Sequence, residues 1–199
     1  MENDKTSTGF IGSLPNYLTY LRLALVPVFV VLMHNPAPWM LDVAIVIFVL
    51  ASLTDYFDGF LARKYGAISD TGKLLDPIAD KILVMAALIM LVAQRSDVDG
   101  EPWVPGWLVV LLLAREIWIT GLRSVAASRG MVIAANDTGK IKSFCQMVGI
   151  VFLLIHHPLK LFGVAIPCEF VGVNLLFLSL ALSLWSAWDY TLRVYSQES

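Results

Sequence analysis

Six largely apolar stretches follow one another along the chain, at residues 17–33, 39–62, 77–95, 105–128, 139–157 and 170–192. A helix that crosses a bilayer needs about 20 largely apolar residues. Of the 199 residues, 58% are hydrophobic and 15% are charged, whereas a soluble domain carries about 25% charged residues. The sequence therefore predicts an all-α integral membrane protein: a six-transmembrane-helix bundle that forms a single domain over residues 1–199.

Only the sixth stretch contains a long uncharged run, from Phe170 to Trp188. In each of the other five, the uncharged run covers about 16–20 Å of helix, against a hydrocarbon core of about 30 Å. These five helices must therefore carry charged residues toward one end. Charged groups that face lipid are costly, so we expect these ends to surround a polar cavity.

The positive charges indicate how the bundle is oriented. If the six stretches alternate in direction, all but two of the 14 Lys and Arg residues fall on the same side; the exceptions are Arg95 and Lys160. Because the positive side of a membrane protein faces the cytoplasm, we expect both termini, a short N-terminal segment (1–16) and the cavity to lie there. The net charge of −2 gives no indication of a nucleic-acid partner.

Four aspartates lie at the predicted cytoplasmic ends of the second and third helices. Asp55 and Asp58 are three residues apart, and Asp76 and Asp80 are four apart, so each pair shares one face of a helix. The second helix is predicted to continue to about residue 64. The third is predicted to begin with Asp76 as its N-cap and Pro77 as its first helical residue.

Four carboxylates in a partly desolvated site need compensating positive charge. Salt bridges to Arg63 and Lys81 are one interpretation. Convergent carboxylate oxygens are also the ligands that Mg²⁺ or Mn²⁺ prefers, and two such ions about 3.5–4 Å apart can share carboxylates. The pattern favours a site for two metal ions, since short carboxylates cannot extend far along a helix to reach water as Lys and Arg do.

Small residues accompany the aspartates. Gly59 and Ala62 follow Asp55 by four and seven positions, so this helix face carries little side-chain bulk. A phosphate-bearing ligand could approach the backbone there, and Gly72 could allow the same. Close helix packing is the alternative interpretation of the small residues.

The whole stretch has the pattern D-x-x-D-G-x-x-A-R-x8-G-x-x-x-D-x-x-x-D, formed by Asp55, Asp58, Gly59, Ala62, Arg63, Gly72, Asp76 and Asp80. At all eight positions it resembles the signature of the CDP-alcohol phosphotransferases. The resemblance implies transfer of a substituted phosphoryl group from a CDP-activated donor to an alcohol, with release of CMP. It also implies a homodimer in the bacterial inner membrane.

The resemblance further implies a role for each motif residue. Asp55, Asp58, Asp76 and Asp80 would bind the two metal ions, and Asp80 would also be the general base. The CDP moiety would be bound by Asp58, Gly59, Ala62, Arg63 and Gly72.

Three further stretches narrow the choice of substrates: NYLTYLR with Pro27, AREIWITGLR at 114–123 and TGKIKSFCQ at 138–146. Together they resemble the bacterial branch of the family that uses CDP-diacylglycerol as donor and glycerol 3-phosphate as acceptor. The acceptor phosphate needs fixed cations, which we predict to be Arg115, Arg123, Lys140 and Lys142. The cytoplasmic charge bias alone is an alternative explanation for all of these except Arg115, which lies deeper, and Glu116 is interpreted as structural.

Other functions remain as alternatives. The same chemistry could serve another acceptor, such as inositol phosphate or serine. Membrane prenyltransferases also bind a pyrophosphate through aspartates and Mg²⁺, but they carry two separate aspartate motifs. A divalent-cation transporter would need carboxylates near the middle of the bilayer, whereas these lie toward one face beside basic residues.

Overall fold

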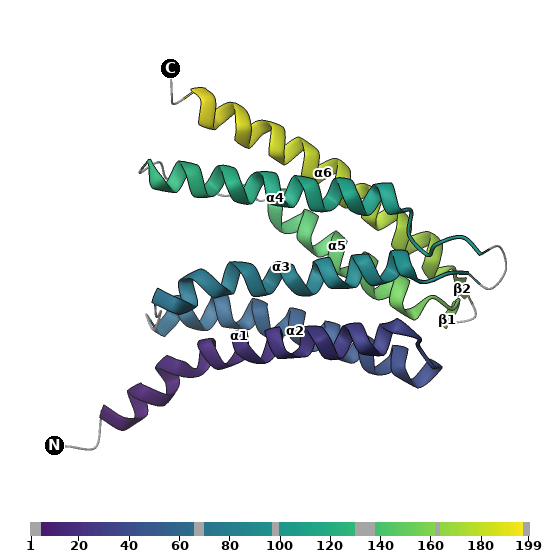
Figure 1. The fold of residues 1–199 in the computed structure, drawn as a ribbon, viewed down its shortest axis with the longest axis horizontal. Coiled ribbons are helices and arrows are strands. Elements are labelled where there is room, and N and C mark those ends of the chain that lie inside the picture. The colour runs from purple at the N-terminus through teal and green to yellow at the C-terminus, as the bar shows by residue number, and fades with distance from the viewer. Residues whose placement is uncertain (1–4, 66–69, 97–99, 130–137, 162–163, 197–199) are drawn as a thin grey trace. The chain divides into compact units, whose positions relative to one another are not determined.

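A computed structural model gives the fold of the chain (Figure 1). It describes residues 5–65, 70–96, 100–129, 138–161 and 164–196, with side chains at 19–54, 81–96, 100–129, 139–159 and 165–196. The chain forms two compact units, Met1–Met90 and Leu91–Ser199. Each unit is described separately below.

The first unit is formed by three helices, α1 (Lys5–His34), α2 (Pro38–Tyr65) and nearly all of α3 (Asp70–Ala93). α1 and α2 lie side by side (Figure 1). Phe29 and Phe48 are fully buried, with ring centroids 6.3 Å apart. Helix α2 begins with Pro38, a favourable first residue because its missing N–H would have no partner within the helix.

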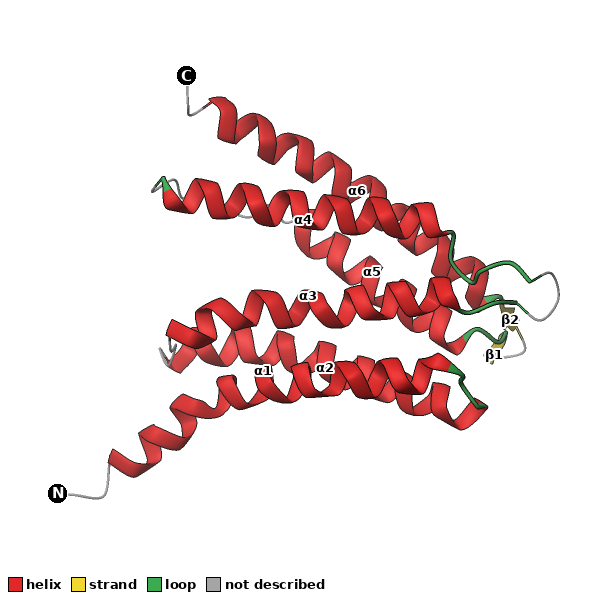
Figure 2. Cartoon of the chain, viewed as in Figure 1, coloured by secondary structure: helices red, strands yellow, loops and turns green. Residues whose placement is uncertain are grey.

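The second unit contains α4 (Gly106–Ser128), α5 (Thr138–Ile155) and α6 (Cys168–Ser196). Two short strands, β1 (Leu159–Leu161) and β2 (Val164–Ile166), join α5 to α6 (Figure 2). They pair antiparallel, with Leu159 opposite Ile166. In this unit α6 packs against both α5 and α4.

Two glycines allow α5 and α6 to approach closely. A Cβ added at Gly172 would lie 2.6 Å from Leu153 Cγ and 2.9 Å from the carbonyl oxygen of Gly149. A Cβ added at Gly149 would lie 3.1 Å from the carbonyl oxygen of Gly172. Small residues at such a crossing are typical of helix pairs in membranes.

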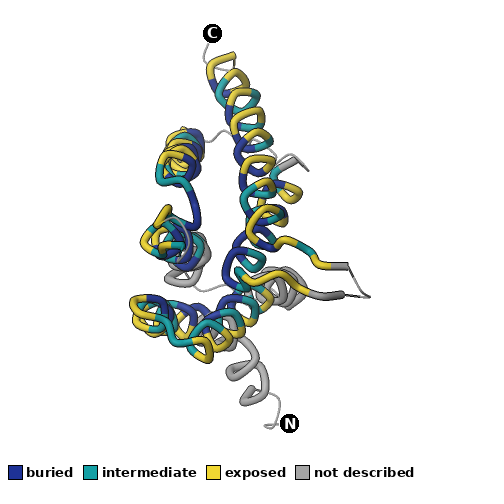
Figure 3. Tube along the Cα trace, turned by 90° about the vertical axis from the view of Figure 1, so that its right-hand side faces the viewer, coloured by how far each residue is buried: buried dark blue, intermediate teal, exposed yellow. Residues whose placement is uncertain are grey.

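Exposed and buried residues recur along helix α6 (Figure 3), and its exposed residues include large apolar ones. Trp185 is 73% exposed and Phe170 is 68% exposed, whereas Ser179 and Ser183 are fully buried. Large exposed apolar surfaces on a monomer mark contact with another apolar phase or with a partner. The pattern is therefore that expected of a helix whose outer face meets lipid.

Within the described residues, α6 is the one helix that is long and apolar enough to cross a membrane. Shorter apolar helical segments cover 19–34, 38–54 and 81–93. This agrees with the prediction that only the sixth stretch is apolar over a long run. The prediction of helices at all six stretches is also confirmed for the part of the chain that the structure describes.

Two helices begin at other residues than predicted. α1 begins at Lys5 rather than near residue 17. The prediction that α3 begins with Asp76 as N-cap and Pro77 as first residue is wrong, because α3 begins at Asp70. A proline inside a helix removes one backbone hydrogen bond, a loss that membrane helices tolerate where neighbouring groups replace it. The hairpin of β1 and β2 was not predicted.

Candidate active site

The aspartate motif lies on two successive helices of the first unit. Asp55, Asp58, Gly59, Ala62 and Arg63 belong to the C-terminal half of α2. Gly72, Asp76 and Asp80 belong to the N-terminal half of α3. The structure describes the backbone of these residues as helical, and their side chains lie outside its described part.

The backbone positions the four aspartates at matching depths. Asp55 lies ten residues before the last residue of α2, and Asp80 lies ten residues after the first residue of α3. At 1.5 Å per residue, both positions are about 15 Å along the helix from the connection, and Asp58 and Asp76 are about 10 Å from it. The four residues 66–69 can span at most about 19 Å, so these two helix ends stay close together. Within this unit α2 and α3 run in opposite directions (Figure 1).

This donor set fits a divalent metal. Four carboxylates at paired depths on two adjoining helix ends supply the oxygen ligands that Mg²⁺ and Mn²⁺ prefer. Among the side chains that the structure describes, which do not include these four, no group of three or more His, Cys, Asp or Glu forms a metal site. The motif is therefore the candidate metal centre.

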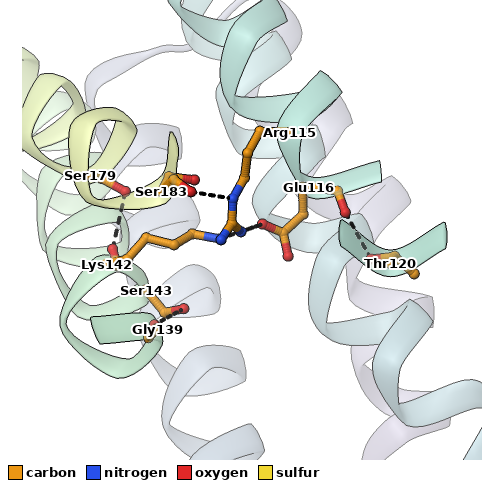
Figure 4. A network of polar contacts seen from close by, with 8 residues as sticks. All are labelled: Arg115, Glu116, Thr120, Gly139, Lys142, Ser143, Ser179 and Ser183. Atoms are coloured by element: carbon orange, nitrogen blue, oxygen red, sulfur yellow. Dashed lines mark hydrogen bonds and ion pairs between the residues drawn. The ribbon is translucent and has the colours of Figure 1, made fainter. Parts of the chain in front are cut away.

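A second polar cluster lies in the other unit, where α4, α5 and α6 meet (Figure 4). We call it the polar network; it consists of Arg115, Glu116, Lys142, Ser179 and Ser183. Arg115 is buried, with 8% of its surface exposed. Its Nε donates a hydrogen bond to the carbonyl oxygen of Ser183 at 2.8 Å, and its Nη1 lies 3.1 Å from Glu116 Oε2.

Glu116 links two predicted acceptor-binding residues. Its Oε2 atom accepts from Arg115 and also from Lys142 Nζ, which belongs to α5. Lys142 is 5% exposed, and its carbonyl oxygen accepts a hydrogen bond of 3.1 Å from the Ser179 hydroxyl. Two buried cations from α4 and α5 thus meet at one carboxylate oxygen, and α6 contacts the guanidinium of Arg115 and the backbone of Lys142.

The other two predicted acceptor-binding residues lie apart from this network. Arg123 is about 12 Å farther along α4 than Arg115. Its guanidinium lies over the ring of Tyr190 on α6, 5.7 Å from the ring centroid. Lys140 is exposed on α5. The structure therefore brings together Arg115 and Lys142 and leaves Arg123 and Lys140 on the surface of the unit.

Both clusters lie within the part of the chain that matches a known family. The family model described as CDP-alcohol phosphatidyltransferase matches residues 12–185, which include the aspartate motif and the whole polar network. The chain belongs to this family. Members of the CDP-alcohol phosphatidyltransferase family are membrane-embedded and generally use divalent metal ions.

Curated relatives within the family share one name, CDP-diacylglycerol–glycerol-3-phosphate 3-phosphatidyltransferase. The Bacillus subtilis protein is 38% identical over 194 residues, which cover 89% of this chain and 93% of the relative. The Rickettsia bellii protein is 41% identical over 143 residues, covering 72% and 75% respectively. The Shigella flexneri protein is 35% identical over 184 residues, covering 89% and 92%.

Several residues of the polar network were not predicted from the sequence. Glu116 was interpreted as structural, although it contacts two of the predicted phosphate-binding cations. Ser179 and Ser183 were not singled out, yet both are fully buried and contact Lys142 and Arg115 through a hydroxyl and a carbonyl group. The available signal was their spacing, because polar residues four apart in an apolar helix share one face.

The stretch NYLTYLR also proves to be partly buried. Thr19 and Arg22 of α1 are each 3% exposed. A buried arginine in a membrane helix must be compensated by polar groups and is therefore a candidate functional residue. Both residues lie in the first unit, with the aspartate motif.

Proposed function

We propose that this protein is a CDP-diacylglycerol–glycerol-3-phosphate 3-phosphatidyltransferase of phosphatidylglycerol biosynthesis. It transfers the phosphatidyl group of CDP-diacylglycerol to glycerol 3-phosphate and releases CMP. The observation that carries this proposal is the complete aspartate motif, at matched depths on α2 and α3. The names of the relatives, which cover most of the chain, support the choice of donor and acceptor.

The aspartates hold the reacting pyrophosphate. Asp55, Asp58, Asp76 and Asp80 bind two Mg²⁺ or Mn²⁺ ions, which, when bound, neutralise negative charge on the pyrophosphate and on the departing CMP. Asp58 and the small residues Gly59, Ala62 and Gly72 leave room for the cytidine nucleotide. Arg63 adds a positive charge beside it.

Asp80 is the general base of the reaction. It takes the proton of the glycerol 1-hydroxyl, and the oxygen attacks the phosphorus that carries the diacylglycerol. A new P–O bond forms to glycerol 3-phosphate, and the bond to the phosphate of CMP breaks. The electron pair of that bond leaves with CMP.

The acceptor phosphate is bound by the basic residues of the second unit. Arg115 and Lys142 are buried cations that both contact Glu116, and Arg115 also donates a hydrogen bond to the carbonyl oxygen of Ser183 on α6. Arginine suits this role because its planar guanidinium matches a phosphate group. Arg123 and Lys140 are exposed and attract the dianionic acceptor from water.

The setting of the reaction is the bacterial inner membrane. Six helices span it, both termini lie in the cytoplasm, and the aspartates open into a polar cavity on that side. The charge distribution of the sequence and the outward apolar face of α6 support this arrangement. A lipid donor can then enter from the membrane and a soluble acceptor from the cytoplasm. The protein acts as a single domain and assembles as a homodimer.

The test is an assay of CMP release by the purified protein with CDP-diacylglycerol and Mg²⁺. Glycerol 3-phosphate, inositol phosphate, serine and no acceptor are compared. We expect release that requires glycerol 3-phosphate, is lost with EDTA, and falls at least about 100-fold in Asp80→Asn, since a general base contributes about 10²–10⁴-fold. Asp42→Asn, an exposed aspartate earlier on α2, should retain activity.

Two outcomes would contradict the proposal in different ways. Release that depends on another acceptor would keep the metal chemistry and overturn the substrate. Folded protein that releases no CMP with any of these acceptors, with metal present, would overturn the assignment as a transferase.

A further inference from the structure

Glu116 occupies the position that an anionic ligand of Arg115 and Lys142 would take. One carboxylate oxygen, Oε2, receives both Arg115 Nη1 and Lys142 Nζ (Figure 4). The other assigned contact of the guanidinium, from Nε, goes to the carbonyl oxygen of Ser183. The two cations are therefore held at the spacing of a single anionic group, and the chain itself supplies that group.

The exposure of the three side chains shows which of them is the most accessible. The side chain of Glu116 is 24% exposed, whereas those of Arg115 and Lys142 are 7% and 6% exposed. An anion that approaches from water meets the carboxylate before it reaches the nitrogen atoms. It can contact both cations only by taking the place of Glu116.

We propose that Glu116 is an internal competitor for the acceptor phosphate. This inference rests on the proposed function and gives Glu116 the role of a positioning residue. While the site is empty, its carboxylate keeps Arg115 and Lys142 oriented. A phosphate monoester displaces the carboxylate from both cations, and the carboxylate returns when the product leaves.

The charges of the groups determine which anion the two cations attract more strongly. Two cations and one carboxylate carry a net charge of +1, so a phosphate dianion is attracted more strongly to the cations than Glu116 is. The displaced carboxylate stays nearby and repels the phosphate, which weakens binding. The product still carries the phosphate monoester of the acceptor, so the same repulsion speeds its release.

The test compares phosphate binding by the wild-type protein and by Glu116→Gln, purified in detergent without phospholipid. Titration calorimetry with inorganic phosphate and with glycerol 3-phosphate measures the affinity directly. We expect the variant to bind both ligands up to about fivefold more tightly, because a partly exposed ion pair contributes up to about 1 kcal/mol. Glu169→Gln, an exposed glutamate in the first turn of α6, is the matched control and should bind like the wild type.

Steady-state kinetics provides a second test, because a substitution that only disturbed the structure would not lower KM for glycerol 3-phosphate. Glu116→Gln should lower KM for glycerol 3-phosphate and lower the concentration at which inorganic phosphate inhibits. KM for CDP-diacylglycerol should stay within about twofold of the wild-type value, since Glu116 is not among the residues proposed to bind the donor.

Unchanged or weaker phosphate binding in folded Glu116→Gln would overturn the proposal, because a residue that only orients the cations would lose affinity when altered. Calorimetry with inorganic phosphate needs neither donor nor metal, so it tests Glu116 even if the protein transfers no phosphatidyl group. A short-chain phosphatidic acid is the comparison ligand. If it alone gains affinity in the variant, the anion that competes with Glu116 is a lipid headgroup and the assignment to the acceptor fails.

Discussion

Arg115 makes two different kinds of contact with its guanidinium group. Nε donates to the carbonyl oxygen of Ser183, and Nη1 contacts the carboxylate of Glu116. A lysine at this position would keep the charge but has a single nitrogen, so it cannot make both contacts from one planar group.

Arg115→Lys should therefore weaken acceptor binding while leaving the charge of the site unchanged. We expect KM for glycerol 3-phosphate to rise at least about tenfold, since a hydrogen bond to a charged group contributes about 1.5–3 kcal/mol. KM for CDP-diacylglycerol should change less than about twofold. The control is Arg193→Lys, whose native arginine is half exposed and pairs with Asp189 one turn earlier on α6. Equal KM values in Arg115→Lys and the wild type would show that Arg115 does not bind the acceptor.

At the residue scale, the sequence was a better guide to candidate site residues than to the contacts between their side chains. Arg115 was singled out because it lies inside an apolar stretch, and its side chain is buried. The role of Glu116 was missed because its partner Lys142 is 26 residues away. The packing of both α4 and α5 against α6 brings the two together, and no local pattern contains that information.

At the scale of the elements, the contact between α5 and α6 depends on the absence of side chains at two positions. Gly149 and Gly172 face each other, and an added Cβ at Gly172 would overlap Leu153 and approach a backbone oxygen. The same two helices position Lys142 and the serines of the polar network.

Gly172→Ala should destabilise the protein by about 1–3 kcal/mol, the usual cost of overpacking. Thermal unfolding in detergent would show a lower midpoint. Gly121→Ala on α4 is the matched control, because nothing lies within 4 Å of its added Cβ and alanine favours a helix by up to about 1 kcal/mol over glycine. A Gly172→Ala midpoint equal to that of Gly121→Ala would contradict the close contact.

The helices themselves were predictable, because apolar stretches of this length leave few alternatives. The residues at which the helices begin were less predictable. Asp76 followed by Pro77 is a good helix-start signal, but α3 begins at Asp70, where another aspartate is followed by Thr71. The hairpin was missed because strands of three residues are too short to produce a clear alternating pattern.

At the scale of the whole molecule, the distribution of charge predicts how the chain lies in the membrane. The connection between α3 and α4 should face outward and the end of α6 inward. Within the loop that connects α3 to α4, the Ser96 N–H donates a hydrogen bond of 2.8 Å to the carbonyl oxygen of Glu101. Trp103 of the same loop stacks on His156, with ring centroids 3.8 Å apart.

Labelling of single introduced cysteines tests this orientation. In intact spheroplasts, an impermeant maleimide should label Glu101→Cys, and it should label Ser196→Cys only after the membrane is opened. Both positions are exposed. The native cysteines Cys145 and Cys168 are buried, so the unmodified protein serves as the background. The reverse pattern of labelling would invert the proposed topology and place the aspartates on the wrong side for a cytoplasmic acceptor.

Helix α6 follows α4 and α5 in the chain, and it supplies the carbonyl group of Ser183 that Arg115 contacts and the Ser179 hydroxyl that binds the Lys142 backbone. Arg115 and Lys142 leave the ribosome before Ser179 and Ser183 of α6, whose groups they contact. The α5–α6 pair is local in sequence and closes quickly once α6 emerges, whereas the α4–α6 contact spans a longer loop. A premature stop before α6 would thus yield a product that carries the entire aspartate motif yet lacks an assembled acceptor site.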